Sequence, residues 1–166
     1  MTRLLTYIAL TLLLAPCLLV ASCSNDSCYD NGSALPLAAL YINDEQQTIR
    51  GLTVMGIGAP GDSLLIDSSS VNEVYLPLRA SVETTSYALW RGIIIDTTIV
   101  VVRDTLTLDY KAVPYFHSVE CGSMYNFDIQ NVKHTYHGID SVVLLKTLVT
   151  NSRTPALRIH FTDFSQ

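Results

Sequence analysis

Ser63 is the residue whose surroundings most resemble a catalytic motif. The string Gly61-Asp62-Ser63-Leu64 matches the sequence around the nucleophilic serine of one group of ester hydrolases. Such a serine needs a strand-to-helix turn and an Asp-x-x-His pair that supplies the base and its orienting carboxylate. The sequence has no Asp-x-x-His, and His160 precedes Asp163 in the reverse order. We therefore interpret the string as a Pro-Gly turn entering a strand, and we predict no catalytic residue and no enzymatic activity.

Metal-ligating residue types occur at two places. His134 and His137 are three residues apart, which in a strand places them on opposite faces, and Cys121 could be a third ligand only if it were unbridged. The oxygen-rich stretch from Asn25 to Asn31 lacks the residue order of a calcium-binding loop. We expect surface histidines and a solvated tether, with no metal and no cofactor.

The amino-terminal residues have the pattern of a secretory signal peptide. Arg3 is followed by an uncharged, apolar run from Leu4 to Ser22. A membrane-spanning helix is the alternative, but Pro16 interrupts the run and no basic cluster follows it. We predict cleavage after residue 22.

The predicted cleavage site has the form of a lipobox. Val20, Ala21 and Ser22 precede Cys23, and small side chains give the lipoprotein signal peptidase access to the bond. Cys23 is the predicted lipidation site, because its thiol would receive a diacylglyceryl group. Cys17 is a poorer candidate, since Pro16 precedes it. Two or three acyl chains on one residue anchor a protein stably in a membrane.

Processing would leave an acidic chain of 144 residues. Removal of residues 1–22 takes away Arg3 and leaves 9 basic side chains against 15 acidic ones, a net charge of −6. This balance disfavours nucleic acid as a partner, since phosphate neutralisation dominates that affinity. Attachment to the membrane would then depend on the lipid alone.

Cleavage removes Cys17 and acylation uses Cys23, so two unmodified cysteines remain, Cys28 and Cys121. In an exported chain we predict a disulfide between them, while two buried thiols stay open as the alternative. Closing so long a loop would stabilise the fold by about 4–5 kcal/mol in the chain-entropy model.

Short apolar segments separated by turns predict an all-β domain over residues 35–166, after the lipidated cysteine and polar tether at 23–34. Leu106, Leu108 and Tyr110 alternate with polar residues, as do the residues in Tyr125–Ile129 and Leu157–Phe161. Continuous apolar runs occupy residues 93–95, 99–102 and 142–145, and for these we expect strands covered on both faces. We predict a single antiparallel β-sandwich of seven to nine strands, with an immunoglobulin-like arrangement as the expected version.

Several motifs resemble those of a known family: Cys28-Tyr29-Asp30, residues 56–65, Tyr75–Leu78, Asp104–Leu106, Glu120–Gly122, His134-Thr135, Ile139-Asp140 and Arg158–Phe161. Together they make the chain resemble small lipoproteins of unknown function from Gram-negative gut bacteria, domain-of-unknown-function family 6452. The resemblance covers residues 28–161. It implies a single exported domain, is consistent with pairing Cys28 to Cys121, and implies no activity.

We therefore expect a non-enzymatic binding or accessory module, lipid-anchored in the cell envelope, whose partner is another envelope protein or a glycan. Ser24 after the lipidated cysteine favours the outer membrane of a Gram-negative bacterium, and the face stays open. One alternative is a structural subunit of an outer-membrane assembly, which would use its sheet edges. Another is an enzyme of unrecognised type acting through Ser63 or the histidines. An exposed aromatic ligand patch also stays open, formed by Trp90, Tyr75, Tyr87, Tyr110, Tyr115 and Tyr136.

Overall fold

Alternating apolar and polar residues form two β-sheets in the computed structural model of the chain, which describes residues 33–119 and 121–164. The predicted signal peptide, the lipobox with Cys23, and Cys28 lie outside the described residues. The described residues belong to one compact unit. None of the helices in the described part of the chain is long and apolar enough to cross a membrane.

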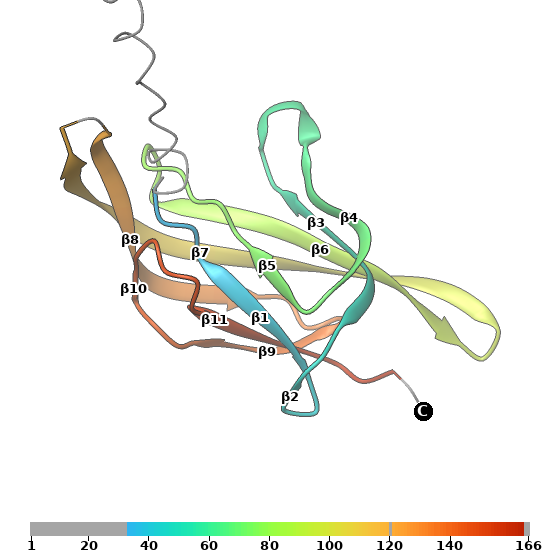
Figure 1. The fold of residues 1–166 in the computed structure, drawn as a ribbon. Helices are drawn as coiled ribbons and strands as arrows, with labels where there is room; N and C mark the ends of the chain where they lie inside the picture. Colours follow the sequence, from blue (N-terminus) through green and yellow to red (C-terminus); the bar gives the residue numbers. More distant parts are fainter. Residues whose placement is uncertain (1–32, 120, 165–166) are drawn as a thin grey trace, which may run out of the picture. The chain divides into compact units, whose positions relative to one another are not determined.

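The first sheet has the strand order β2-β1-β11-β9, and β5 pairs with β1 beside β2 (Figure 1). Its strands are β1 (Leu37–Ile42), β2 (Glu45–Gln46), β5 (Glu73–Tyr75), β9 (Ile139–Leu144) and β11 (Leu157–Phe161). β1 and β11 are parallel, and the other pairs of this sheet are antiparallel.

The second sheet has the order β10-β8-β7-β6-β3-β4, and all of its pairs are antiparallel. Its strands are β3 (Ile49–Gly56), β4 (Leu64–Val71), β6 (Thr84–Ile95), β7 (Thr98–Ser118), β8 (Gly122–His134) and β10 (Leu148–Val149). A 3₁₀ turn, Pro60–Asp62, lies between β3 and β4. The long strands β6, β7 and β8 follow one another as a meander (Figure 1).

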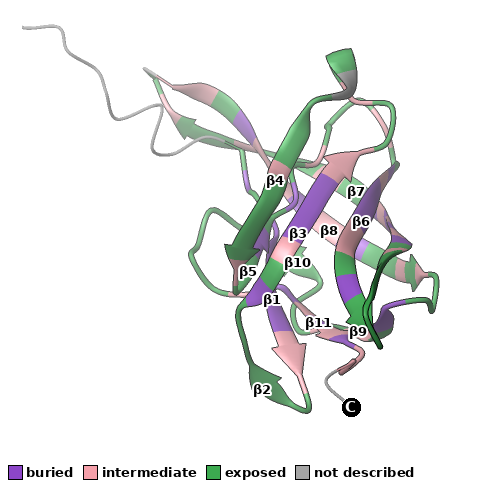
Figure 2. Ribbon diagram, turned by 90° about the vertical axis from the view of Figure 1, so that its right-hand side faces the viewer, coloured by how far each residue is buried: buried purple, intermediate pink, exposed green. Residues whose placement is uncertain are grey.

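The core lies between the two sheets, as the period-2 pattern predicts. Leu106, Leu108 and Tyr110 on β7 are buried, and so are Leu157, Ile159 and Phe161 on β11. These residues belong to one apolar cluster with Leu40 of β1 and with Leu52 and Val54 of β3. Figure 2 shows the contrast between the buried residues of β3 and the exposed strand β4 beside it.

The predicted fold class is confirmed: the described chain is an all-β sandwich. Eleven strands are present among the described residues, and eight of them have five or more residues. Three short strands, β2, β5 and β10, account for the difference from the predicted number. The parallel β1–β11 pair departs from a purely antiparallel sandwich. The immunoglobulin-like version stays a prediction.

The prediction for the continuous apolar runs was wrong. Ile94 and Ile99 are each 71% exposed and Val101 is 64% exposed, so residues 93–95 and 99–102 do not form strands covered on both faces. Val143 and Leu145 are also exposed, because each sheet of a sandwich packs against the other sheet on one face only. An apolar run reveals strand propensity, but the neighbouring strands decide its burial.

Candidate functional site

Ser63 lies where the turn interpretation places it. The 3₁₀ turn Pro60–Asp62 contains Gly61 with φ +67°, and Ser63 is extended and precedes β4 directly. Only glycine adopts such a φ without steric cost, so a Pro-Gly pair suits this turn. Ser63 also lines a cavity, whose described lining residues include no histidine. No base for a nucleophilic serine is therefore present among those residues.

The structure does not bring His134 and His137 together as metal ligands. The ring of His134 packs on Tyr136 with 4.3 Å between ring centroids, whereas Nδ1 of His137 lies 3.2 Å from Oδ1 of Asp104. No group of three or more potential ligands occurs among the residues that the structure describes. Residues 25–31, the other candidate stretch, lie outside them.

Asp104 has a buried carboxylate, only 3% exposed, that accepts four hydrogen bonds from residues 135–139. Its Oδ1 accepts from the Thr135 hydroxyl at 2.6 Å and from the His137 backbone at 2.9 Å. Its Oδ2 accepts from the backbone N–H groups of Gly138 at 2.6 Å and Ile139 at 2.9 Å. Burial opposes the charge, but these four hydrogen bonds outweigh it and hold the pKa of Asp104 below its usual value. Asp104 thus fixes the loop between β8 and β9.

Residues 91–102 form a β-hairpin that extends beyond its sheet neighbours, and we call it the β6–β7 arm. Within the described residues, the pairing of β3 with β6 reaches Trp90, and the pairing of β8 with β7 begins at Leu106. Between these limits, Arg91 to Ile95 pair with Thr98 to Val102. Figure 1 shows this hairpin running out on the right, away from the other strands. The arm therefore has one strand partner per strand instead of two.

The two faces of the arm differ. On the inner face, Ile93 is 7% exposed. On the outer face, Ile94 and Ile99 are cross-strand partners and Val101 lies beside them, and these three form the outer apolar row. Apolar residues grouped in this way on a soluble surface mark interaction sites more often than single exposed residues do.

Trp90 and Arg103 continue the outer row toward the body of the sheet. They are cross-strand partners, and the Arg103 guanidinium lies 4.4 Å from the centroid of the Trp90 ring. At this distance the guanidinium and the ring attract each other, and this cation–π interaction holds both side chains on the sheet surface. Tryptophan and arginine are the residue types most enriched at the energetic centres of protein interfaces.

Contacts at its base hold the arm in place. The Arg91 guanidinium donates to the Thr162 carbonyl at 2.8 Å and lies over the rings of Phe161 and Phe164. Burial lowers the pKa of Arg91, and Asp163 opposes this effect. These interactions join the arm to the residues that follow β11.

A cavity of about 230 Å³ lies at another part of the second sheet, between the β3–β4 loop, β6 and the segment that follows β5. We call it the β3–β4 cavity, and its walls are mainly apolar. Its described lining residues are Gly56, Ile57, Ala59, Pro60, Ser63, Leu65, Pro77, Arg79, Thr85 and Tyr87. The loop is fixed by hydrogen bonds from the Ile57 amide to the Ser86 carbonyl, 2.8 Å, and from the Ala59 amide to the Gly56 carbonyl, 3.1 Å.

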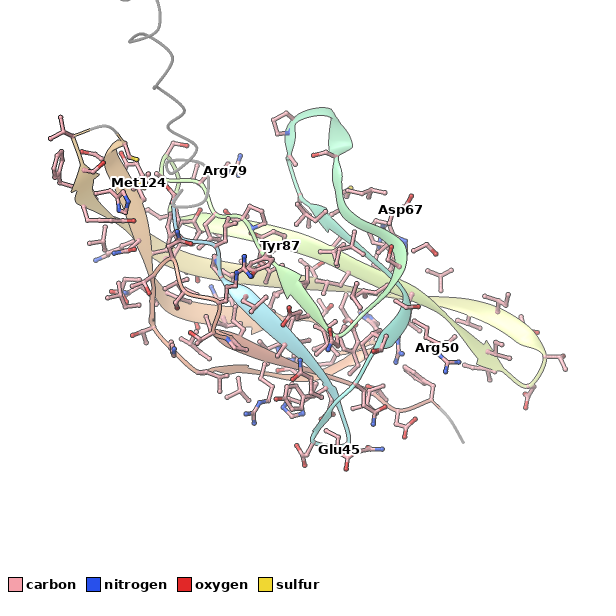
Figure 3. The ribbon with its side chains drawn as sticks, viewed as in Figure 1. Glu45, Arg50, Asp67, Arg79, Tyr87 and Met124 are labelled. Carbon is pink, nitrogen blue, oxygen red and sulfur yellow. The ribbon has the colours of Figure 1, made fainter. Side chains whose placement is uncertain are left out.

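Hydroxyl groups connect the cavity floor to its wall. The Tyr87 hydroxyl donates to the Pro77 carbonyl. The Tyr110 hydroxyl donates to the Arg79 carbonyl at 2.9 Å and accepts from the Arg79 amide at 3.1 Å. Its contact of 2.8 Å with the Thr85 hydroxyl then has Thr85 as donor. Tyr110 of β7 therefore holds the backbone at Arg79, and Figure 3 labels Arg79 and Tyr87.

The aromatic residues considered as an exposed patch do not share one surface. Tyr87 and Tyr110 are buried, whereas Tyr75 and Tyr136 are exposed. Trp90 is three residues from Tyr87 on the same strand, so their side chains point to opposite faces. Burial raises the pKa of the Tyr87 phenol far above its usual value, Tyr110 adds to the effect, and Arg79 opposes it. Tyr87 is therefore a neutral hydrogen-bond donor of the cavity floor.

Sequence reasoning missed both the arm and the cavity as sites. One signal for the arm was present: two apolar runs of similar length flank Asp96-Thr97, where Asp96 has φ +56°. This symmetry predicts a hairpin tip. The cavity combines residues from three separate segments, and their juxtaposition depends on the sheet order.

Cys121 lies in the turn between β7 and β8, where its amide donates to the Ser118 hydroxyl at 3.1 Å. Its proposed partner Cys28 lies outside the described residues, so the pairing stays a prediction.

Comparison with known proteins places this domain in a family. No curated protein and no solved structure matches the chain. The family model described as a family of unknown function, DUF6452, matches residues 51–161, which include the arm, Asp104 and every described residue that lines the β3–β4 cavity. The chain belongs to the DUF6452 family.

Proposed function

We propose that the chain is a lipid-anchored module of the cell envelope, without enzymatic activity, that binds another envelope component through the β6–β7 arm. The observation that carries the proposal is the outer apolar row of Ile94, Ile99 and Val101, which is exposed and has no strand beside it among the described residues. Burial of these side chains against a partner would remove apolar surface from water, which favours association.

The residues next to the row support recognition of a protein or a glycan. Trp90 and Arg103 offer a flat apolar ring and a guanidinium at the end of the row. The guanidinium already covers one face of the ring, and its N–H groups can donate hydrogen bonds to a partner side chain or to sugar hydroxyls. The base of the arm is fixed by Arg91, so little conformational entropy would be lost on binding.

The proposed compartment comes from the sequence pattern around Cys23. Acylation of that cysteine after cleavage at Ser22 would keep the domain at the membrane surface. Ser24 favours the outer membrane. A partner of the arm would then be a component of the same envelope, held near the domain by the shared membrane.

The alternative of a structural subunit that assembles through the β4 edge has less support. Strand β4 is the long edge of the second sheet, but its register with β3 shifts at three places and Ser68 has φ +40°. Irregularities of this kind interrupt the regular row of N–H and C=O groups that strand addition requires. The apolar arm is therefore the better supported surface.

Site-specific photocrosslinking in cells tests the proposal. A photoreactive amino acid at Ile99 should capture one envelope protein or glycan of discrete mass, and Ile94→Glu in the same chain should abolish that adduct. The same probe at Leu148 of β10, also an exposed apolar residue, is the matched control and should not yield it. Identical adducts from both positions, adducts with lipid alone, or none from Ile99 would overturn the proposal.

A further inference from the structure

We propose that the β3–β4 cavity is a binding site for a small carboxylate with a short apolar body. The inference rests on the lining of the cavity and is independent of the arm and of the membrane anchor. Three observations carry it: the size of the cavity, the composition of its walls and the position of Arg79.

The size and walls of the cavity set the body of the ligand. A volume of about 230 Å³ corresponds to roughly eight water molecules at about 30 Å³ each, so the ligand has about eight non-hydrogen atoms. The cavity is smaller than typical sites for drug-sized ligands, which occupy about 300–1,000 Å³. Ile57, Pro60, Leu65 and Pro77 supply apolar walls, which favour an alkyl or aryl body.

Arg79 sets the charge of the ligand. It is the only cationic side chain among the described lining residues, and it makes no ion pair with the described carboxylates. Its backbone is held by the Tyr110 hydroxyl at both N–H and C=O. A guanidinium whose attachment point is fixed in this way is suited to a planar carboxylate, which it can bind with two N–H donors.

The remaining polar groups of the cavity do not oppose an anion. The Tyr87 phenol stays neutral and donates to Pro77, and the Thr85 hydroxyl donates to Tyr110. Ser63 lies at the exposed rim with a hydroxyl that can donate to the second carboxylate oxygen. The described lining thus offers Arg79 and Ser63 as anion-binding groups above an apolar floor.

Equilibrium dialysis with hexanoate tests the charge requirement, with 1-hexanol as the uncharged probe of equal chain length. The full chain would be reconstituted in phosphatidylcholine vesicles, with protein-free vesicles as the blank. We expect a Kd for hexanoate in about the millimolar range, because a ligand of this size offers few contacts. Arg79→Gln should weaken hexanoate binding by about three- to tenfold and leave 1-hexanol binding unchanged. Arg153→Gln, a change at another exposed arginine outside the lining, should alter neither.

A second pair of variants assigns the binding to the cavity. Leu65→Trp should fill the cavity and abolish the binding of both probes, while Leu64→Trp, on the preceding exposed residue of β4, should preserve it. Unchanged β-sheet circular dichroism in each variant would show that the fold persists, and Ile57→Trp serves if Leu65→Trp unfolds. The proposal would be overturned if each probe bound wild type and Arg79→Gln with the same Kd. It would also be overturned if binding persisted in the filled variants, or if hexanoate showed no saturable binding.

Discussion

The Oδ2 atom of Asp104 accepts a hydrogen bond of 2.6 Å from the backbone N–H of Gly138. The same glycine lies against the base of the β6–β7 arm, since a Cβ at residue 138 would be only 2.7 Å from Cγ1 of Val102. Val102 is the arm residue that pairs with Arg91. This buried carboxylate therefore connects the loop between β8 and β9 to the arm, and the first predictions follow from it.

Asp104→Asn should destabilise the domain by about 2–3 kcal/mol, because the carboxylate accepts hydrogen bonds from one hydroxyl and three backbone N–H groups. An amide offers one acceptor oxygen and turns an N–H₂ group toward other donors. Urea denaturation followed by circular dichroism measures the loss. Asp109→Asn is the matched control, since its hydrogen bonds with Lys133, Thr84 and Asn131 lie at the surface, and its loss should be clearly smaller. Equal losses would contradict the role given to Asp104.

The stabilisation from Asp104 should disappear in acid. Its folded pKa lies below the ordinary value of 3.8, so near pH 3.8 the unfolded chain binds the proton more readily than the folded chain. The contribution is therefore complete above that pH and is lost as the pH falls through the folded pKa. The difference in unfolding free energy between wild type and Asp104→Asn should be constant from about pH 6 to 5 and shrink below about pH 4. A difference that grows in acid would contradict this sign.

Gly138→Ala should destabilise the base of the arm by about 1–3 kcal/mol, because the added methyl group overlaps Val102. Val102→Ala removes the methyl group that the new Cβ would overlap. Gly138→Ala should therefore cost less in the Val102→Ala background than it does in wild type. Gly92→Ala is the control, since its Cβ meets only the exposed Ile99 side chain, at 3.2 Å, and that side chain can rotate. Thermal unfolding compares these four variants with wild type. Strict additivity of the changes at residues 138 and 102 would exclude the steric contact as the cause.

The sandwich could be predicted because its strands contrast buried and polar faces. Leu106, Leu108 and Tyr110 alternate with polar residues, so any arrangement that buries one set exposes the other. The same contrast made Leu157–Phe161 recognisable as a strand. The parallel pairing of that strand with β1 was not predictable, since strand direction depends on chain connections that a local pattern does not encode.

The arm and the cavity escaped prediction for a different reason. Ile94 and Ile99 lie in apolar runs whose composition is typical of buried strands. They are exposed because the pairing of β3 with β6 ends at Trp90. The cavity combines Leu65, Arg79 and Tyr87 from three segments that meet only in the folded sheet. Asp104 stands in one of the family motifs of the sequence, but nothing local reveals that Gly138 is near it. Sites of this kind depend on long-range register.

The mature domain should contain one disulfide, between Cys28 and Cys121. Mass spectrometry of the non-reduced, digested chain should show the two peptides joined, and reduction should separate them. In the chain-entropy model the bond would contribute about 4–5 kcal/mol, so Cys121→Ser should lower the unfolding free energy by a comparable amount. Ser118→Ala removes only the hydroxyl that accepts from the Cys121 amide and should have a small effect. Two alkylatable thiols in the native chain would contradict the pairing.

Cys23→Ser should leave the precursor uncleaved and without lipid, because the thiol is the acceptor of the diacylglyceryl group and cleavage by the lipoprotein signal peptidase follows that transfer. The measurements are the intact mass of the purified chain and its partition between membrane and soluble fractions. Cys17→Ser, the matched control within the leader, should be processed like wild type, since Pro16 makes its peptide bond a poor site. Two or three acyl chains give stable anchoring, so the wild type should resist extraction by salt and yield to detergent. A Cys23→Ser chain that carries acyl mass would overturn the lipobox interpretation, and the partner of the arm would then no longer be expected in the envelope.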